Sequence, residues 1–156
     1  MAGIRVRKFA RYAVYAVSLS LIESIISAFL ATAIVLLTSR GAITAGDVRD
    51  TVAFVGAFHL VATGVRLLMN VPVVIIALFT IAPRLPFSPK VSAAVTNVFV
   101  YICGLTAVIA IEGNLSNLPR IFPIYSTFAI SCAFSPFVSW IQPPFASGAP
   151  RAAASR

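Results

Sequence analysis

One carboxylate and one guanidinium stand out because each interrupts a long apolar run. Glu23 lies in the stretch SLSLIESIISAF, residues 18–29, which carries no other charge. A second apolar run, residues 51–82, carries Arg66 as its one charged residue, together with His59. A carboxylate and a guanidinium can form a hydrogen-bonded ion pair, and a carboxylate inside a membrane can also exchange a proton or a cation. Glu23 and Arg66 are therefore the candidate intramembrane ion pair, or the candidate proton or ion site.

The other polar residues of the second run share a helical face with Arg66. Steps of three and four residues connect neighbours on a helix surface, and here they connect Gly56, His59, Thr63, Arg66 and Asn70. All the strongly polar groups of this run therefore lie on one face. Such a face is expected to turn toward the interior of a helix bundle.

The other apolar runs carry similar faces. In the first run the same steps connect Glu23 with small residues: Ala16, Ser20, Ser27 and Ala31. The third run offers Asn97, Tyr101 and Gly104, and the fourth offers Thr127, Ser131 and Ser135. We interpret the serines of the fourth run as packing residues. We define the polar seam as His59, Thr63, Asn70, Asn97 and Tyr101.

The composition is that of a membrane protein. Of the 156 residues, 60% are apolar and 10% are charged, whereas soluble proteins carry about 25% charged residues. The net charge of +8 does not indicate nucleic-acid binding, because most basic residues are confined to the chain ends and to the gaps between apolar runs. We expect contact with the lipid bilayer and no binding of nucleic acid.

Four apolar runs each reach the length of about 20 residues that a helix needs to cross a membrane. They cover residues 12–38, 51–82, 91–111 and 121–141. The gaps between them are short and carry Gly, Pro, Asn and charged residues. The sequence therefore predicts an all-α integral membrane bundle of four transmembrane helices with short loops, forming one domain over residues 1–142. Residues 143–156, rich in Pro, Ala and Ser, are predicted to be a disordered cytoplasmic tail.

Basic residues flank the predicted helices unequally. Eight lie on the side that holds both termini: Arg5, Arg7, Lys8, Arg11, Arg84, Lys90, Arg151 and Arg156. Three lie on the opposite side: Arg40, Arg49 and Arg120. Because cytoplasmic loops carry the excess of Lys and Arg, we expect both termini in the cytoplasm and the helices in the plasma membrane.

The start of the chain also imitates a secretory signal. It has basic residues, an apolar stretch and the small-residue pattern ATA at residues 31–33, where cleavage would occur. However, the apolar stretch continues through IVLL, is longer than an ordinary signal core and has Glu23 in its middle. We therefore expect the first helix to be retained.

Glu23 and Arg66 are predicted to lie at similar depths in the membrane. At a rise of about 1.5 Å per residue, each lies about 22 Å from the outer end of its helix. Each charge alone costs on the order of 3 kcal/mol at a helix centre, so pairing them is the most favourable arrangement. The second run, however, is about 48 Å long, well beyond a hydrocarbon core of about 30 Å. If its excess projects outward, Arg66 reaches the interface, and Glu23 needs a partner from another subunit or is protonated.

The sequence lacks the motifs of common enzyme sites. It has no Gly-x-Ser-x-Gly elbow, no HExxH motif and no Walker loop, and His59 is the only histidine, so a bis-histidine haem site lacks its second ligand. Cys103 and Cys132 lie in separate apolar runs without a CxxC motif, which indicates packing rather than a metal or redox site. We expect no enzymatic activity, no metal and no cofactor.

Two functions fit these features. The first is a small polytopic membrane protein that acts as a non-enzymatic subunit or accessory factor of a larger membrane complex, with Glu23 and Arg66 as a buried lock. Its expected partners are other membrane subunits or further copies of the chain. The alternative is a proton- or cation-coupled transporter or channel, working as a homo-oligomer, in which Glu23 is the exchanging carboxylate. Small size and short loops favour the accessory subunit.

Overall fold

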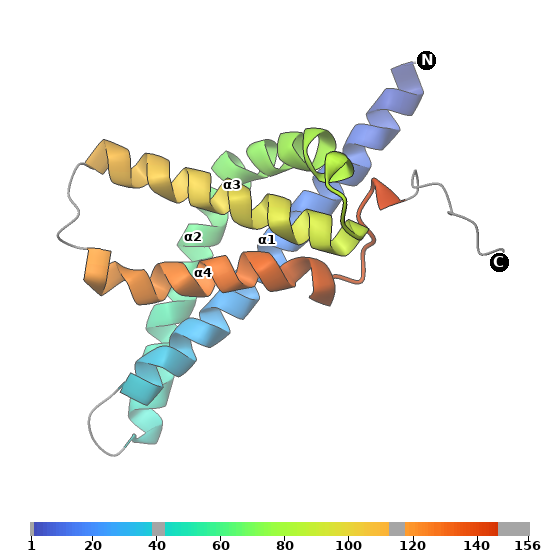
Figure 1. Cartoon of the computed structure of the whole chain (residues 1–156). Helices are drawn as coiled ribbons and strands as arrows, with labels where there is room; N and C mark the ends of the chain where they lie inside the picture. Colours follow the sequence, from blue (N-terminus) through green and yellow to red (C-terminus); the bar gives the residue numbers. More distant parts are fainter. Residues whose placement is uncertain (1, 39–42, 113–117, 147–156) are drawn as a thin grey trace, which may run out of the picture.

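The structure, a computed structural model, describes residues 2–38, 43–112 and 118–146. These ranges contain α1 (Ala2–Thr38), α2 (Ala45–Thr80), the short 3-10 helix η1 (Ala82–Arg84), α3 (Pro89–Glu112) and α4 (Leu118–Val138) (Figure 1). No strand occurs within the described ranges. The predicted all-α class with four long helices is confirmed.

Three helices in the described part of the chain are long and apolar enough to cross a membrane. These spans are Val6–Thr38, Ala45–Arg84 and Pro89–Ala107. The described apolar part of α4, Tyr125–Val138, is shorter than the roughly 20 residues that a crossing needs. The length and apolarity of the three spans indicate a membrane protein.

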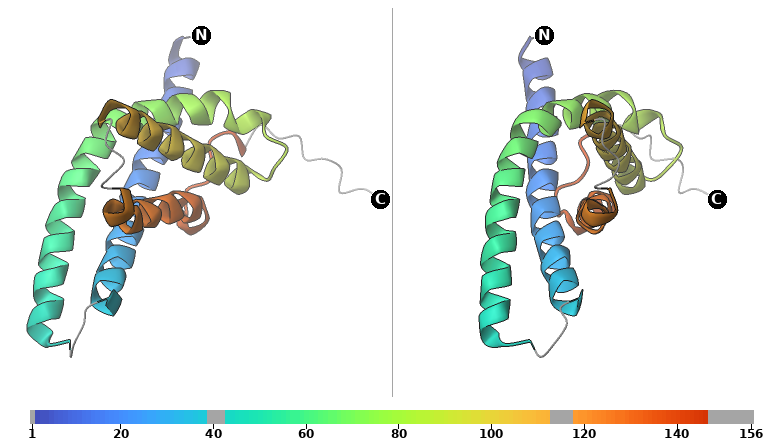
Figure 2. Two further views of the ribbon diagram at one scale, coloured as in Figure 1. Left: turned by 60° about the vertical axis from the view of Figure 1, so that its left-hand side comes forward. Right: turned by 90° about the vertical axis from the view of Figure 1, so that its left-hand side faces the viewer.

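The helices form two antiparallel pairs that cross steeply. α1 and α2 run side by side as one long pair, and α3 and α4 form the other (Figure 1). In the right-hand view of Figure 2, α1 and α2 are seen from the side, whereas α3 and α4 are seen nearly end-on. α1 packs against α2 and α4, while α3 packs against α4 and α2. The end of the first pair at which α1 finishes and α2 begins therefore extends past α4.

The helix α2 changes direction in its second half (Figure 2). Pro72 lies inside this half. A proline inside a helix removes one backbone hydrogen bond and clashes with the carbonyl four residues earlier, which bends the helix. A straight helix of 36 residues would be about 54 Å long, against a hydrocarbon core of about 30 Å. The bend redirects the excess length toward the start of α3.

The helix ends differ from the ends of the apolar runs. At the start of α2, the Thr44 hydroxyl accepts the backbone N–H of Asp47 at 3.2 Å, and the Asp47 carboxylate accepts the backbone N–H of Thr44 at 2.9 Å. This capping box starts α2 at Ala45 rather than at residue 51. α1 begins at Ala2 rather than at residue 12, and α4 ends at Val138 rather than at residue 141. At the starts of α1 and α2, polar residues continue the helix beyond its apolar stretch, whereas α4 ends before its apolar stretch does.

The apolar core lies where the first half of α1, the second half of α2 and the start of α3 meet. It comprises Tyr12, Tyr15, Ala16, Leu19, Val71, Val74, Ile75, Leu78, Ala82 and Ala93. Ile141 and Phe145, which follow α4, pack against this core. Residues 143–146, which we predicted to be disordered, form a turn with a 2.9 Å hydrogen bond from the N–H of Ala146 to the carbonyl of Pro143, because Phe145 anchors them. The rest of the predicted tail, residues 147–156, lies outside the described residues.

We expect Leu78→Ala to lower the free energy of unfolding by about 2–5 kcal/mol, because it removes a side chain that is 0% exposed from the core. Leu68→Ala is the matched control on the same helix, since Leu68 is 80% exposed. The control is expected to change the free energy by no more than about 0.5 kcal/mol. Equilibrium unfolding in detergent micelles, followed by circular dichroism, measures both variants. Equal losses would contradict the packing of α2 described here.

Candidate functional site

The carboxylate of Glu23 on α1 receives donors from each of the other three helices. Its Oε2 is ion-paired with Nη2 of Arg66 on α2. Its Oε1 accepts hydrogen bonds from Nδ2 of Asn97 on α3 and from Oγ of Ser135 on α4, the latter at 3.0 Å. The Glu23 side chain is only 2% exposed. We call these four residues the carboxylate cluster.

The cluster explains how a charge is tolerated at this depth. Removing a carboxylate from water costs several kcal/mol, and the charge is retained only when a countercharge and hydrogen bonds replace the lost water. Arg66 supplies the countercharge, while Asn97 and Ser135 supply the hydrogen bonds to the second oxygen. Because each donor comes from a different helix, the carboxylate is fully satisfied only when all four helices are packed together.

A proline on α4 orients Asn97. Pro136 has no N–H, so the carbonyl of Cys132 lacks its ordinary helical partner. Nδ2 of Asn97 donates to this carbonyl at 3.2 Å as well as to Glu23. Both acceptors are oxygens that cannot donate, so the amide nitrogen, not the amide oxygen, must face them. The helix defect thus supplies the acceptor that holds Asn97 in place.

Arg66 is held on one side only. Its Nη2 contacts Glu23 and also Sγ of Cys132 at 3.4 Å, and its guanidinium lies over the ring of Phe128, with 5.1 Å from Cζ to the ring centroid. Its Nη1 is buried and has no hydrogen-bond partner among the described residues. The cation is therefore stabilised by one carboxylate and one aromatic face.

A second polar group lies one helical turn from Glu23. Oγ of Ser27 is 3.0 Å from Nε2 of His59 and 3.0 Å from Oγ1 of Thr127. Nδ1 of His59 is 2.9 Å from the carbonyl of Val55, which can only accept, so Nδ1 carries a proton. In the neutral ring, Nε2 then accepts from the Ser27 hydroxyl. The Phe128 ring stacks on His59 at 5.3 Å and links this group to Arg66.

The remaining residues of the polar seam do not join the carboxylate cluster. The Thr63 hydroxyl donates to the His59 carbonyl on its own helix at 2.6 Å. The Tyr101 hydroxyl donates to the Tyr125 carbonyl at 2.9 Å and ties α3 to α4. Asn70 is half-buried and lines a groove between α2 and α3. Of the predicted site residues, the structure brings together Glu23, Arg66 and Asn97, with His59 in the neighbouring group.

Sequence reasoning missed Ser135 and Cys132 as contacts of the charged pair. We interpret the serines of the fourth run as packing residues, yet Ser135 donates to Glu23. The Cys132 sulfur contacts Arg66, and the Cys132 carbonyl accepts from Asn97. One signal was present. Pro136 follows Ser135 directly and frees the carbonyl of Cys132, which marks this turn of α4 as a place that must find donors elsewhere.

The described residues offer no cluster for a metal. No group of three His, Cys, Asp or Glu side chains that could hold a metal ion occurs among them. Cys132 is buried and Cys103 is exposed, and both are free thiols. Both ring nitrogens of His59 face a hydrogen-bond partner, so neither lone-pair position points at open space. The chemistry that this site can perform is ion pairing and proton transfer along hydrogen bonds.

Comparisons with protein-family models, with curated proteins and with solved structures found no match to the chain. The carboxylate cluster and the exposed surface are therefore the features that bear on function.

We expect Glu23→Leu to lower the free energy of unfolding by about 3–5 kcal/mol, because it leaves the Arg66 cation buried without a countercharge. The double variant with Arg66→Leu should recover a large part of this loss, since no charge then remains inside. Equilibrium unfolding in detergent measures both variants. The same stability in the single and the double variant would show that the ion pair does not form.

Asn97→Leu is expected to be less harmful when Pro136 is replaced. In the Pro136→Ala background the new N–H can bond the Cys132 carbonyl. With Pro136 in place, loss of the Asn97 amide leaves this carbonyl only the longer, 3.4 Å hydrogen bond from the Ser135 hydroxyl. We expect a coupling of about 1 kcal/mol between the two substitutions in a double-mutant cycle of unfolding free energies. Pro72→Ala is the control, because it changes a proline of another helix. Strict additivity for both prolines would refute the role assigned to Pro136.

Proposed function

We propose that this chain is a non-enzymatic subunit or accessory factor of a larger membrane complex. The observation that carries this proposal is that both carboxylate oxygens of Glu23 are bound by other side chains. Its carboxylate is 2% exposed, and both oxygens are bound by side chains of the same chain. A group that exchanges protons or cations with a pathway needs access to that pathway, whereas a group that holds helices together needs complete satisfaction. The cluster has the properties of a lock.

The outer surface supports a role in assembly. Large apolar side chains project from the first helix pair and from the segment that follows α4. They include Ile25, Phe29, Leu37, Phe54, Leu60, Leu68, Met69 and Trp140, which are each at least 70% exposed. Two glycines of α2, Gly56 and Gly64, also face outward, since a Cβ added to either meets no atom within 4 Å. Glycine costs about 1 kcal/mol relative to Ala in a helix, and on an outer face it permits close approach of another helix. Lipid and partner helices are the environments that such a surface suits.

The basic residues support insertion in the plasma membrane with both termini in the cytoplasm. The first turns of α1, the end of α2 and the start of α3 lie at the same end of the molecule (Figure 1). This end carries Arg7, Lys8, Arg11, Arg84 and Lys90. The excess of Lys and Arg marks the cytoplasmic side of membrane proteins.

One observation favours the alternative of proton-coupled transport. The hydrogen-bonded chain from His59 through Ser27 to Thr127 crosses between α2, α1 and α4 beside the carboxylate cluster. Hydroxyls and a neutral imidazole can pass a proton by exchanging donor and acceptor roles. In that case Glu23 is a gate whose release from Arg66 accompanies transport.

The accessory role predicts a defined complex. Solubilised from its native host in mild detergent, the wild-type protein is expected to co-elute at fixed stoichiometry with larger membrane proteins identified by mass spectrometry. Gly64→Leu should reduce the ratio of partner to bait if α2 forms the interface, because the added side chain fills the approach that glycine leaves open. Gly104→Leu on α3 is the matched control with equally free space. A homogeneous homo-oligomer without another membrane protein would contradict the proposal.

Glu23→Gln distinguishes the lock from the gate. An amide in place of the carboxylate removes the countercharge of Arg66, so a lock variant should fall several-fold in abundance in the membrane and lose its co-eluting partners. Immunoblotting of membrane fractions and the co-elution ratio measure both effects. A gate variant would instead stay assembled and lose a proton flux in reconstituted vesicles. Normal abundance together with lost flux would replace the accessory role by transport.

A further inference from the structure

One end of the molecule carries several exposed cations. Arg7, Lys8 and Arg11 are exposed on the first turns of α1, and Arg84 is exposed on η1. Among the residues that the structure describes, the single ion pair joins Arg66 to Glu23. Asp47 and Asp50 lie in the first turns of α2, at the opposite end of the first helix pair (Figure 1). The charge at this end is therefore not neutralised by carboxylates of Glu23, Asp47 or Asp50.

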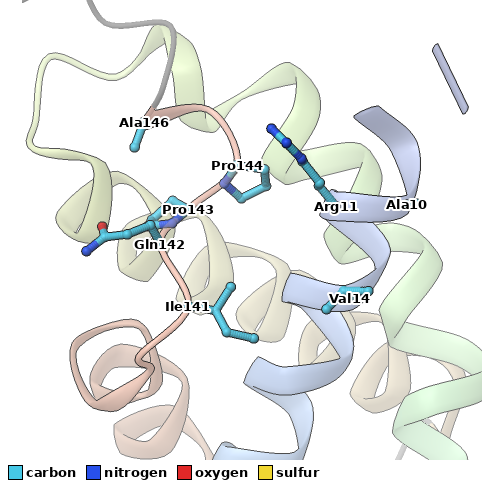
Figure 3. A pocket seen from close by; sticks show the side chains of 8 residues that line it. All are labelled: Ala10, Arg11, Val14, Ile141, Gln142, Pro143, Pro144 and Ala146. Carbon is cyan, nitrogen blue, oxygen red and sulfur yellow. The ribbon is translucent and has the colours of Figure 1, made fainter. Parts of the chain in front are cut away.

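A groove opens beside these cations. It lies between the start of α1 and the segment that follows α4, and it has a volume of about 470 Å³ (Figure 3). Its walls are mainly apolar, with Ala10 and Val14 on one side and Ile141 and Pro143 on the other. Arg11 also lines the groove and extends from α1 toward the segment that carries Pro144 (Figure 3). The groove thus combines apolar walls with the positive charge of Arg11.

A second arginine lies on the same helical face as Arg11. Arg7 precedes Arg11 by four residues, which is the spacing of neighbours on a helix surface. Two like charges at this spacing repel each other and destabilise the helix, so a bound anion would stabilise both. A phosphate accepts hydrogen bonds from guanidinium groups in matching planar geometry.

We infer that this groove binds one anionic phospholipid. The acyl chain lies along Val14 and Ile141, and the headgroup phosphate lies against Arg11 and Arg7. Basic pockets beside membrane helices on the cytoplasmic side recognise anionic lipids through this combination of an apolar wall and a cationic rim. A soluble phosphate would use only the rim. The inference rests on the membrane location proposed above and is independent of the accessory role.

Native mass spectrometry of the full-length protein tests this site. The protein is titrated in neutral detergent micelles with dioleoyl phosphatidylglycerol or with dioleoyl phosphatidylcholine, and the fraction carrying one lipid is measured. We expect the wild type to retain phosphatidylglycerol in preference to phosphatidylcholine. Arg11→Gln should weaken phosphatidylglycerol binding about fivefold, and the double variant with Arg7→Gln should weaken it further.

Two further variants distinguish lipid binding in the groove from nonspecific lipid binding to surface charge. Arg49→Gln removes the same charge from an exposed residue at the opposite end and should leave lipid binding unchanged. Ala10→Phe adds bulk to the groove wall without changing charge and should weaken binding at least as much as Arg11→Gln. Melting temperatures without added lipid check that each variant is folded.

The outcomes are decisive in both directions. Weaker binding for Arg11→Gln and Ala10→Phe, with unchanged binding for Arg49→Gln, supports the site. Equal binding of both lipids, or equal loss for Arg49→Gln and Arg11→Gln, overturns it. Because the assay uses the purified chain, a missing partner complex in co-elution would refute the accessory role and leave the lipid result intact.

Discussion

The packing of the four helices depends on the burial of one carboxylate. Glu23 cannot remain charged in an apolar interior unless its lost water is replaced, and the replacements come from α2, α3 and α4. Removing any one helix leaves a buried charge or a buried donor unsatisfied. Apolar contacts alone would tolerate sliding or rotation of these helices, because one apolar surface resembles another. The carboxylate cluster is specific, since its donors meet at one register only.

Two prolines adapt the backbone to this cluster. Pro72 lies in the half of α2 that turns away from the axis of the first half, so the end of α2 runs toward α3 instead of continuing along that axis. Pro136 leaves the Cys132 carbonyl free to hold Asn97 against Glu23. Both effects follow from the missing N–H and the fixed ring of proline. A bend or a free carbonyl weakens an isolated helix. In this structure, both contribute to contacts between helices.

Much of this arrangement could be predicted from the sequence. Charges are rare in apolar runs, so Glu23 and Arg66 are conspicuous, and helical spacing placed His59 and Arg66 on a common face. The steep crossing of the two helix pairs could not be predicted, because it depends on which faces interlock and not on how apolar each helix is. Ser135 was missed for a related reason. Serine occurs in many membrane helices as a packing residue, and only its position relative to Glu23 distinguishes it.

Polar groups in the interior and polar groups on the surface have different roles in this molecule. The ionisable groups of the interior bind other interior side chains: Glu23 binds Arg66, and His59 binds Ser27. The exterior is apolar along the helices and cationic at one end, with Arg7 and Arg11 exposed there. The buried charge of Glu23 is therefore occupied in holding the helices of its own chain. Exposed apolar faces suit partner helices or lipid tails, and exposed cations suit headgroups, so the two proposals made above both concern the surface.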